Sequence, residues 1–172
     1  DATRRAAARR LGDAMAARGI RVLGVARGGW RGAVPTSPHA LGLQWQGLVG
    51  FSDPLRETVP AAIDECRAAG LRVVMITGDY PATARAIAEQ AGIGDDGSVL
   101  DGATLASLDD AALRARVRQT SLYARIAPAQ KLRIVEALKA GGEVVAMTGD
   151  GVNDAPALKQ AEDKVAKAEV AN

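Results

Sequence analysis

The stretch that most constrains this chain is residues 148–154, which read Thr-Gly-Asp-Gly-Val-Asn-Asp. The apolar run 144–147 before it is typical of a short buried strand, and the segment from Ala155 onward predicts the start of a helix. Glycines let the backbone turn sharply and approach a ligand closely, and carboxylates are hard oxygen ligands that Mg²⁺ prefers. The stretch therefore predicts a strand–loop–helix with a ligand site at the carboxyl end of a strand, where open α/β sheets bind ligands.

A plainer interpretation of the same residues is a polar turn whose Asp and Asn side chains cap the following helix. A second Thr-Gly-Asp, at 77–79, favours the ligand site. It also follows an apolar run, 71–76, which is typical of a strand buried on both faces. Parallel strands end at one edge of a sheet, so the two tripeptides are expected to lie at the same edge.

Apolar runs and helical patterns alternate between residues 57 and 161. The predicted helices cover 57–69, 82–90, 108–118, 129–140 and 153–161, and the predicted strands cover 71–76, 122–124 and 143–147. Gly70 and Gly92 are typical of residues just past a helix, and Pro128 is typical of a first helical residue. The alternation predicts βαβ units and a parallel sheet flanked by helices, an α/β fold.

The N-terminal part has a different pattern, with a predicted helix over 3–18, a strand over 20–26, a loop over 28–40 and a strand over 41–51. Aromatic residues make up only 3% of the chain, so its core must consist of Ala, Val, Leu and Ile. The formal net charge of +2 is too small to indicate nucleic acid as a partner. No apolar run approaches the roughly 20 residues of a membrane helix, so we expect the chain itself to be soluble.

Residues on the predicted sheet edge combine a hydroxyl, a cation and a carboxylate. Thr77 offers a hydroxyl and a backbone N–H at the start of a helix, a natural anion site. Lys131, early in the helix that Pro128 opens, could neutralise a phosphoryl group, and Asp150 could hold Mg²⁺. Together they predict a phosphoryl-transfer site. A covalent mechanism also needs a nucleophile, commonly an Asp, and we find no other strand-end Asp with suitable neighbours.

Several of these motifs resemble the phosphorylation domain of P-type ATPases, ion pumps of the haloacid-dehalogenase-like superfamily. The resemblance rests on Thr77-Gly78-Asp79, on residues 125–131 (Arg-Ile-Ala-Pro-Ala-Gln-Lys) and on residues 148–159, in the family's order and spacing. Residues 53–56 (Asp-Pro-Leu-Arg) are similar to the family's Asp-Pro-Pro-Arg, with Leu55 in place of a proline. Residues 19–23 resemble the end of the family's nucleotide-binding domain.

The resemblance implies a role for each matching residue. It implies a Rossmann-type, haloacid-dehalogenase-like parallel sheet, with Asp150 binding the catalytic Mg²⁺ and Asp154 bracing the loop. Three residues are expected to contact the phosphoryl group, namely Thr77, Lys131 and Asn153. The residues expected on the ATP-binding side or at the hinge between the two domains are Arg21, Asp53, Arg56, Gly78, Asp79 and Arg125.

The same resemblance implies that the chain is a fragment of a larger protein at the cytoplasmic face of a membrane. Residues 1–40 would be the end of the nucleotide-binding domain and its linker, and residues 41–172 an incomplete phosphorylation domain. The family's phosphorylated Asp, in an Asp-Lys-Thr-Gly-Thr string, is missing, so we expect this fragment alone to be inactive. The expected partners are ATP and the parent's remaining nucleotide-binding, actuator and transmembrane domains.

Other interpretations remain open at the level of sequence. The chain could come from a soluble haloacid-dehalogenase-like phosphatase, which shares the hydroxyl, lysine and aspartate chemistry. It could also be a non-catalytic module that binds Mg²⁺ or nucleotide. The transported cation and the oligomeric state are not encoded in these motifs, although the stretch 76–93 resembles the calcium-pump-like branch. After Ala161 the family's next strand is not recognisable, which suggests a skipped segment.

Overall fold

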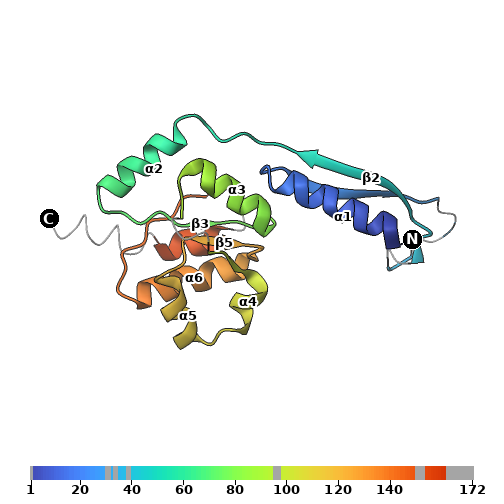
Figure 1. Ribbon diagram of the computed structural model, residues 1–172. Coiled ribbons are helices and arrows are strands. Elements are labelled where there is room, and N and C mark those ends of the chain that lie inside the picture. Colours follow the sequence, from blue (N-terminus) through green and yellow to red (C-terminus); the bar gives the residue numbers. More distant parts are fainter. Residues whose placement is uncertain are drawn as a thin grey trace. The chain divides into compact units, whose positions relative to one another are not determined.

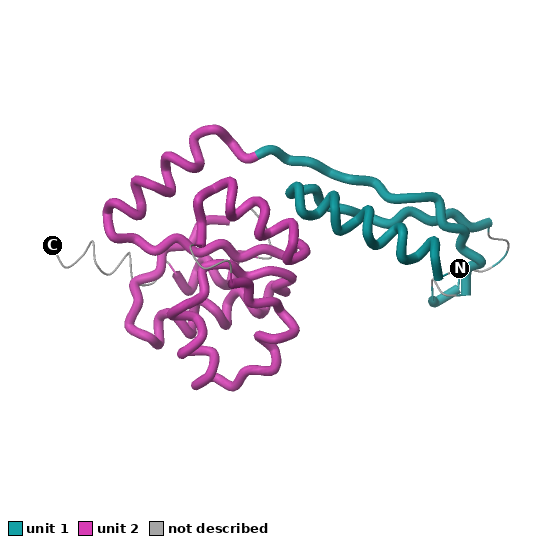
Figure 2. The backbone as a smooth tube through the Cα atoms, viewed as in Figure 1, with its two compact units in different colours: residues 1–54 teal, residues 55–172 magenta. Residues whose placement is uncertain are grey.

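The computed structural model describes residues 2–29, 32, 35–37, 40–94, 98–149 and 154–161. The chain divides into two compact units, residues 1–54 and residues 55–172 (Figure 2). The predicted boundary after residue 40 concerns the domains of a larger parent protein, and that assignment stays a prediction.

The first unit is a helix on a two-stranded sheet. Its elements are α1 (Ala2–Ala16), β1 (Arg21–Arg27) and β2 (Gln44–Phe51). The strands pair antiparallel from Arg21 opposite Phe51 to Arg27 opposite Gln44. Helix α1 packs closely on this ribbon, because a Cβ added to Gly50 would overlap the side chains of Met15 and Ile20. The predicted strand over 41–51 therefore pairs with the predicted strand over 20–26.

The second unit is a parallel sheet between helices (Figure 1). Its strands are β3 (Met75–Ile76), β4 (Leu100–Asp101) and β5 (Leu122–Ala124), in the order β3-β5-β4, with both pairs parallel. Its helices are α2 (Val59–Ala68), α3 (Pro81–Ala91), α4 (Gly102–Ser107), α5 (Asp110–Val117) and α6 (Pro128–Ala140). Residues 155–161 are also helical. This arrangement confirms the predicted α/β fold with a parallel sheet flanked by helices.

Strand β5 divides the core into two layers because neighbouring side chains of a strand point to opposite faces. Leu122 and Ala124 pack with Ala84 and Ala88 of α3. Tyr123 packs on the other side among buried residues of α4, α5 and α6. A third cluster joins α6 to the last described helix through Val135, Ala157 and Ala161. The core is aliphatic apart from Tyr123, as the composition predicts.

The helix boundaries follow the predicted signals. Pro128 is the first residue of α6, as predicted, and Pro81 is the first residue of α3, one residue before the predicted start. Gly92 ends α3 with φ of 74°, a left-handed conformation that glycine adopts without steric cost. Asp109 caps α5 by accepting a hydrogen bond from the Ala112 N–H at 2.8 Å. Among the described residues, none of the helices combines the length and apolarity needed to cross a membrane.

Two predicted strands are wrong in extent or in kind. The run 71–76 forms a strand only at Met75–Ile76, and Leu71 is 59% exposed. Strand β3 is at the edge of the described sheet, so one of its sides lacks the ladder that would extend it. Residues 143–147 form no regular strand, because they pair with no strand in the described part of the chain. Val145 and Met147 still pack inward, whereas Val144 is exposed.

The sequence patterns predicted no helix or strand between the predicted helices 82–90 and 108–118, but the structure has β4 and α4 there. The signal was present in the sequence. Asp101 accepts a hydrogen bond from the Thr104 N–H at 2.7 Å, which is the N-cap arrangement. That bond also holds the pKa of Asp101 below its usual value.

Candidate active site

The first Thr-Gly-Asp forms a closed polar turn at the end of β3. The Thr77 hydroxyl donates to Asp79 Oδ2 at 2.9 Å and accepts from the Asp79 N–H at 3.1 Å. The Thr77 N–H donates to the Tyr123 carbonyl at 2.9 Å, which continues the ladder between β3 and β5. Thr77 and Asp79 are half-buried, and Gly78 is exposed. The strand ending thus holds the Thr77 hydroxyl in a defined position beside a carboxylate.

The loop that follows β5 is joined to this turn by backbone hydrogen bonds. The Arg125 N–H donates to the Asp79 carbonyl at 2.9 Å, and the Ile126 N–H donates to the Thr77 carbonyl at 3.1 Å. Arg125 has φ of 53°, the only positive φ of a non-glycine residue in the described part of the chain. Such backbone strain persists where the surrounding structure imposes it, often at functional sites. Its side chain is exposed, as a nucleotide-contacting residue requires.

Lys131 and Asp154 form an ion pair close to the start of the second Thr-Gly-Asp, which begins at Thr148. Lys131 Nζ lies 2.6 Å from Asp154 Oδ1, and the two side chains are only 17% and 10% exposed. Lys131 comes from the first turns of α6, and Asp154 directly precedes the last described helix. A Cβ added to Gly149 would lie 2.9 Å from Asp154 Oδ2, so a larger residue there would require the Asp154 side chain to move. The structure therefore brings two of the predicted site residues together across 23 positions of sequence.

Gln130 lies in the 125–131 motif but had no predicted role, and it connects the site to α4. Its Oε1 accepts from the Ala127 N–H at 2.9 Å, and its Nε2 donates to the Gly102 carbonyl at 2.7 Å. A Gln at the third helical position is the capping-box position, so the spacing from Ala127 was the available signal. Ala127 has no side-chain oxygen and returns only its carbonyl, to the Gln130 N–H at 2.9 Å.

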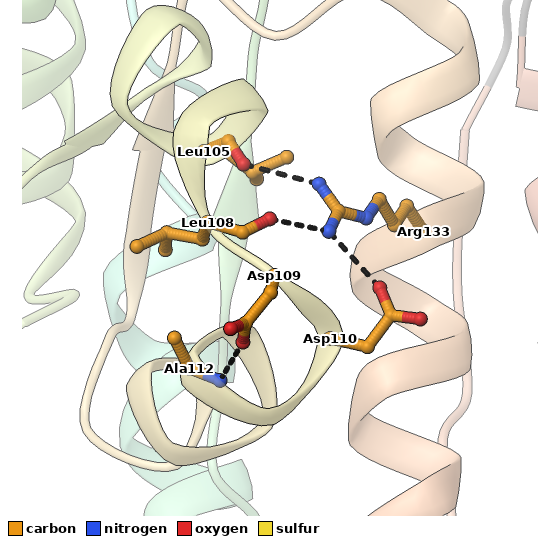
Figure 3. Close-up of polar contacts among 6 residues, drawn as sticks. All are labelled: Leu105, Leu108, Asp109, Asp110, Ala112 and Arg133. Atoms are coloured by element: carbon orange, nitrogen blue, oxygen red, sulfur yellow. Dashed lines mark hydrogen bonds and ion pairs between the residues drawn. The ribbon is translucent and has the colours of Figure 1, made fainter.

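Arg133 fixes the same helix one turn later (Figure 3). Its guanidinium donates to the Leu105 carbonyl at 3.1 Å, to the Leu108 carbonyl at 2.6 Å and to Asp110 Oδ1 at 3.0 Å. These acceptors lie at the end of α4 and the start of α5. Arg133 therefore ties the α4–α5 connection to α6, next to the helical turn that carries Lys131.

Other predicted site residues are not brought to this cluster by the described structure. Arg21 and Asp53 belong to the first unit, and Arg56 is an exposed residue just before α2 in the second. Asp150 and Asn153 lie outside the described residues, so their predicted roles stay predictions. Within the described ranges, no group of three or more His, Cys, Asp or Glu side chains forms a metal site. The assignment of Mg²⁺ to Asp150 stays a prediction from the sequence.

Comparison with known proteins agrees with these motifs. A probable cation-transporting ATPase F of Mycobacterium tuberculosis is 45% identical over 94% of this chain. The cation-transporting ATPase pma1 of Synechocystis is 45% identical over 88% of it, and a calcium-transporting ATPase 1 of Bacillus cereus is 49% identical over 70%. The chain spans only 19%, 17% and 14% of the lengths of these three relatives. The profile of haloacid dehalogenase-like hydrolases matches residues 5–162, and the chain belongs to this family.

Proposed function

We propose that this chain is the cytoplasmic phosphorylation region of an ATP-driven cation pump of the P-type class. The observation that carries the proposal is the shielded pair of Lys131 and Asp154 beside the Thr-Gly-Asp loop, in a chain 45% identical to cation-transporting ATPases. An enzyme that moves phosphoryl groups needs a cation held where negative charge develops. The position of Lys131 early in α6 and its ion pair with Asp154, which orients the ammonium group, support this role.

The proposed reaction transfers the γ-phosphoryl group of ATP to an Asp of the parent protein that lies outside this chain. Water then hydrolyses the aspartyl phosphate. The Thr77 hydroxyl and the Lys131 ammonium would bind the phosphoryl oxygens, and exposed Arg125 would meet the nucleotide. Asn153 is proposed as a further phosphoryl ligand. Gly78 and Asp79, in the same turn, would line the nucleotide side.

Mg²⁺ fits the donor set that the sequence places in this loop, because Asp150 offers a hard carboxylate oxygen and Asp154 is already engaged by Lys131. When bound, Mg²⁺ would neutralise charge on the phosphoryl oxygens. The parent's other domains would supply the nucleophile, most nucleotide contacts and the path across the membrane. Relatives named as calcium-transporting make Ca²⁺ the first cation to test.

The test is phosphorylation of the full-length parent protein by radiolabelled ATP with Mg²⁺. Asp150→Asn should abolish the acid-stable phosphoenzyme, because the amide loses the charge that binds the metal. Asp64→Asn is the matched control, since Asp64 lies exposed on α2 and pairs only with nearby Arg67 among the described contacts. A normal phosphoenzyme level in Asp150→Asn would overturn the proposal. Hydrolysis of simple phosphate esters without any phosphoenzyme would instead favour the phosphatase alternative.

A further inference from the structure

We propose that Gln130 and Gly102 are positioning residues, which hold the 125–128 loop and the first turn of α6 so that Arg125 and Lys131 face the reacting phosphates. This inference rests on the proposed function, because it assigns the two residues to that same site. Neither residue carries a charge. Gln130 lies inside the 125–131 motif without an assigned role, and Gly102 lies outside the motifs. Their part is visible only in the contacts between α4, the loop and α6.

Gln130 joins three segments with one amide. Through Oε1 it accepts from the Ala127 N–H at the start of α6, and through Nε2 it donates to the Gly102 carbonyl at the start of α4. The first bond fixes the direction in which the loop enters the helix. The second bond ties that entry to a separate helix, 28 residues earlier in the sequence. The loop between Arg125 and Pro128 therefore cannot shift without breaking a bond to Gln130.

Gly102 provides the space that the loop needs. It is buried, and a Cβ added there would overlap the Arg125 carbonyl oxygen and lie 2.8 Å from Gln130 Oε1. The Arg125 carbonyl is thus seated against the bare Cα of Gly102. This contact accounts for the left-handed φ of Arg125, which the neighbouring Asp79 and Thr77 carbonyls also hold through backbone bonds. A larger residue at position 102 would push the Arg125 backbone out of its place.

The rotation of α6 is fixed by the same contacts. Gln130 and Arg133 are three residues apart and lie on one face of the helix. Gln130 holds the first carbonyl of α4, and Arg133 holds the carbonyls of Leu105 and Leu108 at its end. Lys131, about 100° around the helix from Gln130, is thereby directed at Asp154 rather than at solvent. The contacts of Gln130 and Arg133 with α4 therefore set the direction of the Lys131 side chain.

Three variants of the full-length protein test the proposal. Gln130→Glu keeps the acceptor for the Ala127 N–H, but at neutral pH its carboxylate has no proton for the Gly102 carbonyl. Gly102→Ala keeps Gln130 and displaces the Arg125 carbonyl. Asp64→Asn is the control, because Asp64 is exposed on α2 and its described ion pair is with Arg67, away from the loop and α6. For each, one measures the rate of phosphoenzyme formation, the KM for ATP, the denaturation midpoint and hydrogen–deuterium exchange in a peptide covering 122–132.

We expect Gln130→Glu and Gly102→Ala to slow phosphoenzyme formation by about ten- to a hundredfold, as a small misplacement of reacting groups does. Both should raise the KM for ATP and speed amide exchange at 125–127, whereas Asp64→Asn should leave all four measurements nearly unchanged. Unchanged exchange at 125–127 in both variants would overturn the positioning role, whether or not the protein forms a phosphoenzyme. Changes in the rate of phosphoenzyme formation and in the KM for ATP that are no larger than those of the control variant would overturn it as well. A wild-type protein without phosphoenzyme would contradict the proposed function alone, and exchange would still decide the role of Gln130.

Discussion

Lys131 Nζ and Asp154 Oδ1 lie 2.6 Å apart, with both side chains largely shielded from water. A charge that loses its partner in such a place keeps its desolvation cost. We expect Lys131→Met to lower the free energy of unfolding by about 2–3 kcal/mol. Adding Asp154→Leu should recover much of that loss. Urea denaturation of the two single variants and the double variant measures the coupling.

The control for this comparison of single and double variants is the pair of Asp64 and Arg67 on α2, with side chains 73% and 51% exposed. Screened pairs of this kind contribute less than about 1 kcal/mol. Asp64→Asn should therefore leave the unfolding free energy nearly unchanged. Strictly additive effects of Lys131→Met and Asp154→Leu would contradict the interpretation of the shielded pair.

A substitution at Gly149 provides a second test of the Lys131–Asp154 pair, because Gly149 lies against the Asp154 side chain. A methyl group there would meet Asp154 Oδ2 at 2.9 Å and its Cγ at 3.2 Å. Gly149→Ala should displace the carboxylate, cost about 1–3 kcal/mol of stability and reduce phosphoenzyme formation in the parent protein. Gly42→Ala is the control, since a Cβ at Gly42 meets nothing within 4 Å. Equal behaviour of the two variants would mean that Asp154 does not need its present position.

Substitution of Arg125 is expected to affect stability and nucleotide binding differently. Its φ of 53° costs free energy for any residue with a Cβ, typically about 1 kcal/mol or more. Arg125→Gly should relieve this strain and leave the unfolding free energy within about 1 kcal/mol of the original, since glycine also gains entropy in the unfolded chain. The KM for ATP should rise because the guanidinium is gone. An unchanged KM would show that Arg125 does not meet the nucleotide.

Tyr123 carries the one buried side-chain polar atom without a hydrogen-bond partner among the described residues, its hydroxyl. Burial raises the pKa of Tyr123 to about 12 from its usual 10.0, partly opposed by the nearby charge of Arg72. The folded protein then holds this proton more tightly than the unfolded chain does. Its contribution to stability is complete below pH 10 and is lost between pH 10 and 12, by up to about 1.4 kcal/mol per pH unit.

Tyr123→Phe should therefore be as stable as the original protein at pH 7, or up to about 1 kcal/mol more stable. Its stability should fall less steeply above pH 10. Denaturation midpoints of the two proteins at pH 7 to 11 provide the comparison. Tyr80→Phe, at a half-exposed position, is the control and should change neither value. A marked loss of stability in Tyr123→Phe at pH 7 would mean that the hydroxyl does have a partner.

Local signals predicted the helices well, because their ends are determined by few neighbouring residues. Pro128, Gly70 and Gly92 act through their own backbone geometry, and each lies where the sequence predicted it. Strands depend on distant partners. The run 71–76 is long and apolar, yet only Met75–Ile76 finds a neighbour in β5. Residues 143–147 find none in the described part of the chain, so their apolar pattern alone could not make a strand.

In the candidate site too, some residues were recognisable from the sequence and others only from their neighbours in the structure. Charged or strand-end residues such as Lys131, Thr77 and Asp154 stood out from motif and spacing, and the structure joins Lys131 to Asp154. Gln130 and Gly102 did not stand out, because an amide and a glycine gain meaning only from their three-dimensional neighbours. Their contact joins α4 to α6, and the sequence patterns predicted no helix where α4 lies.

The central claim is that these residues serve a phosphorylated Asp elsewhere in a larger ATPase. The most direct measurement is to label the full-length protein with radiolabelled ATP and Mg²⁺, with and without Ca²⁺, and to locate the phosphate by mass spectrometry. We predict an acid-stable, hydroxylamine-sensitive phosphate on an Asp outside residues 1–172. A phosphate on a residue within this chain, or no phosphoenzyme under any cation condition, would contradict the account.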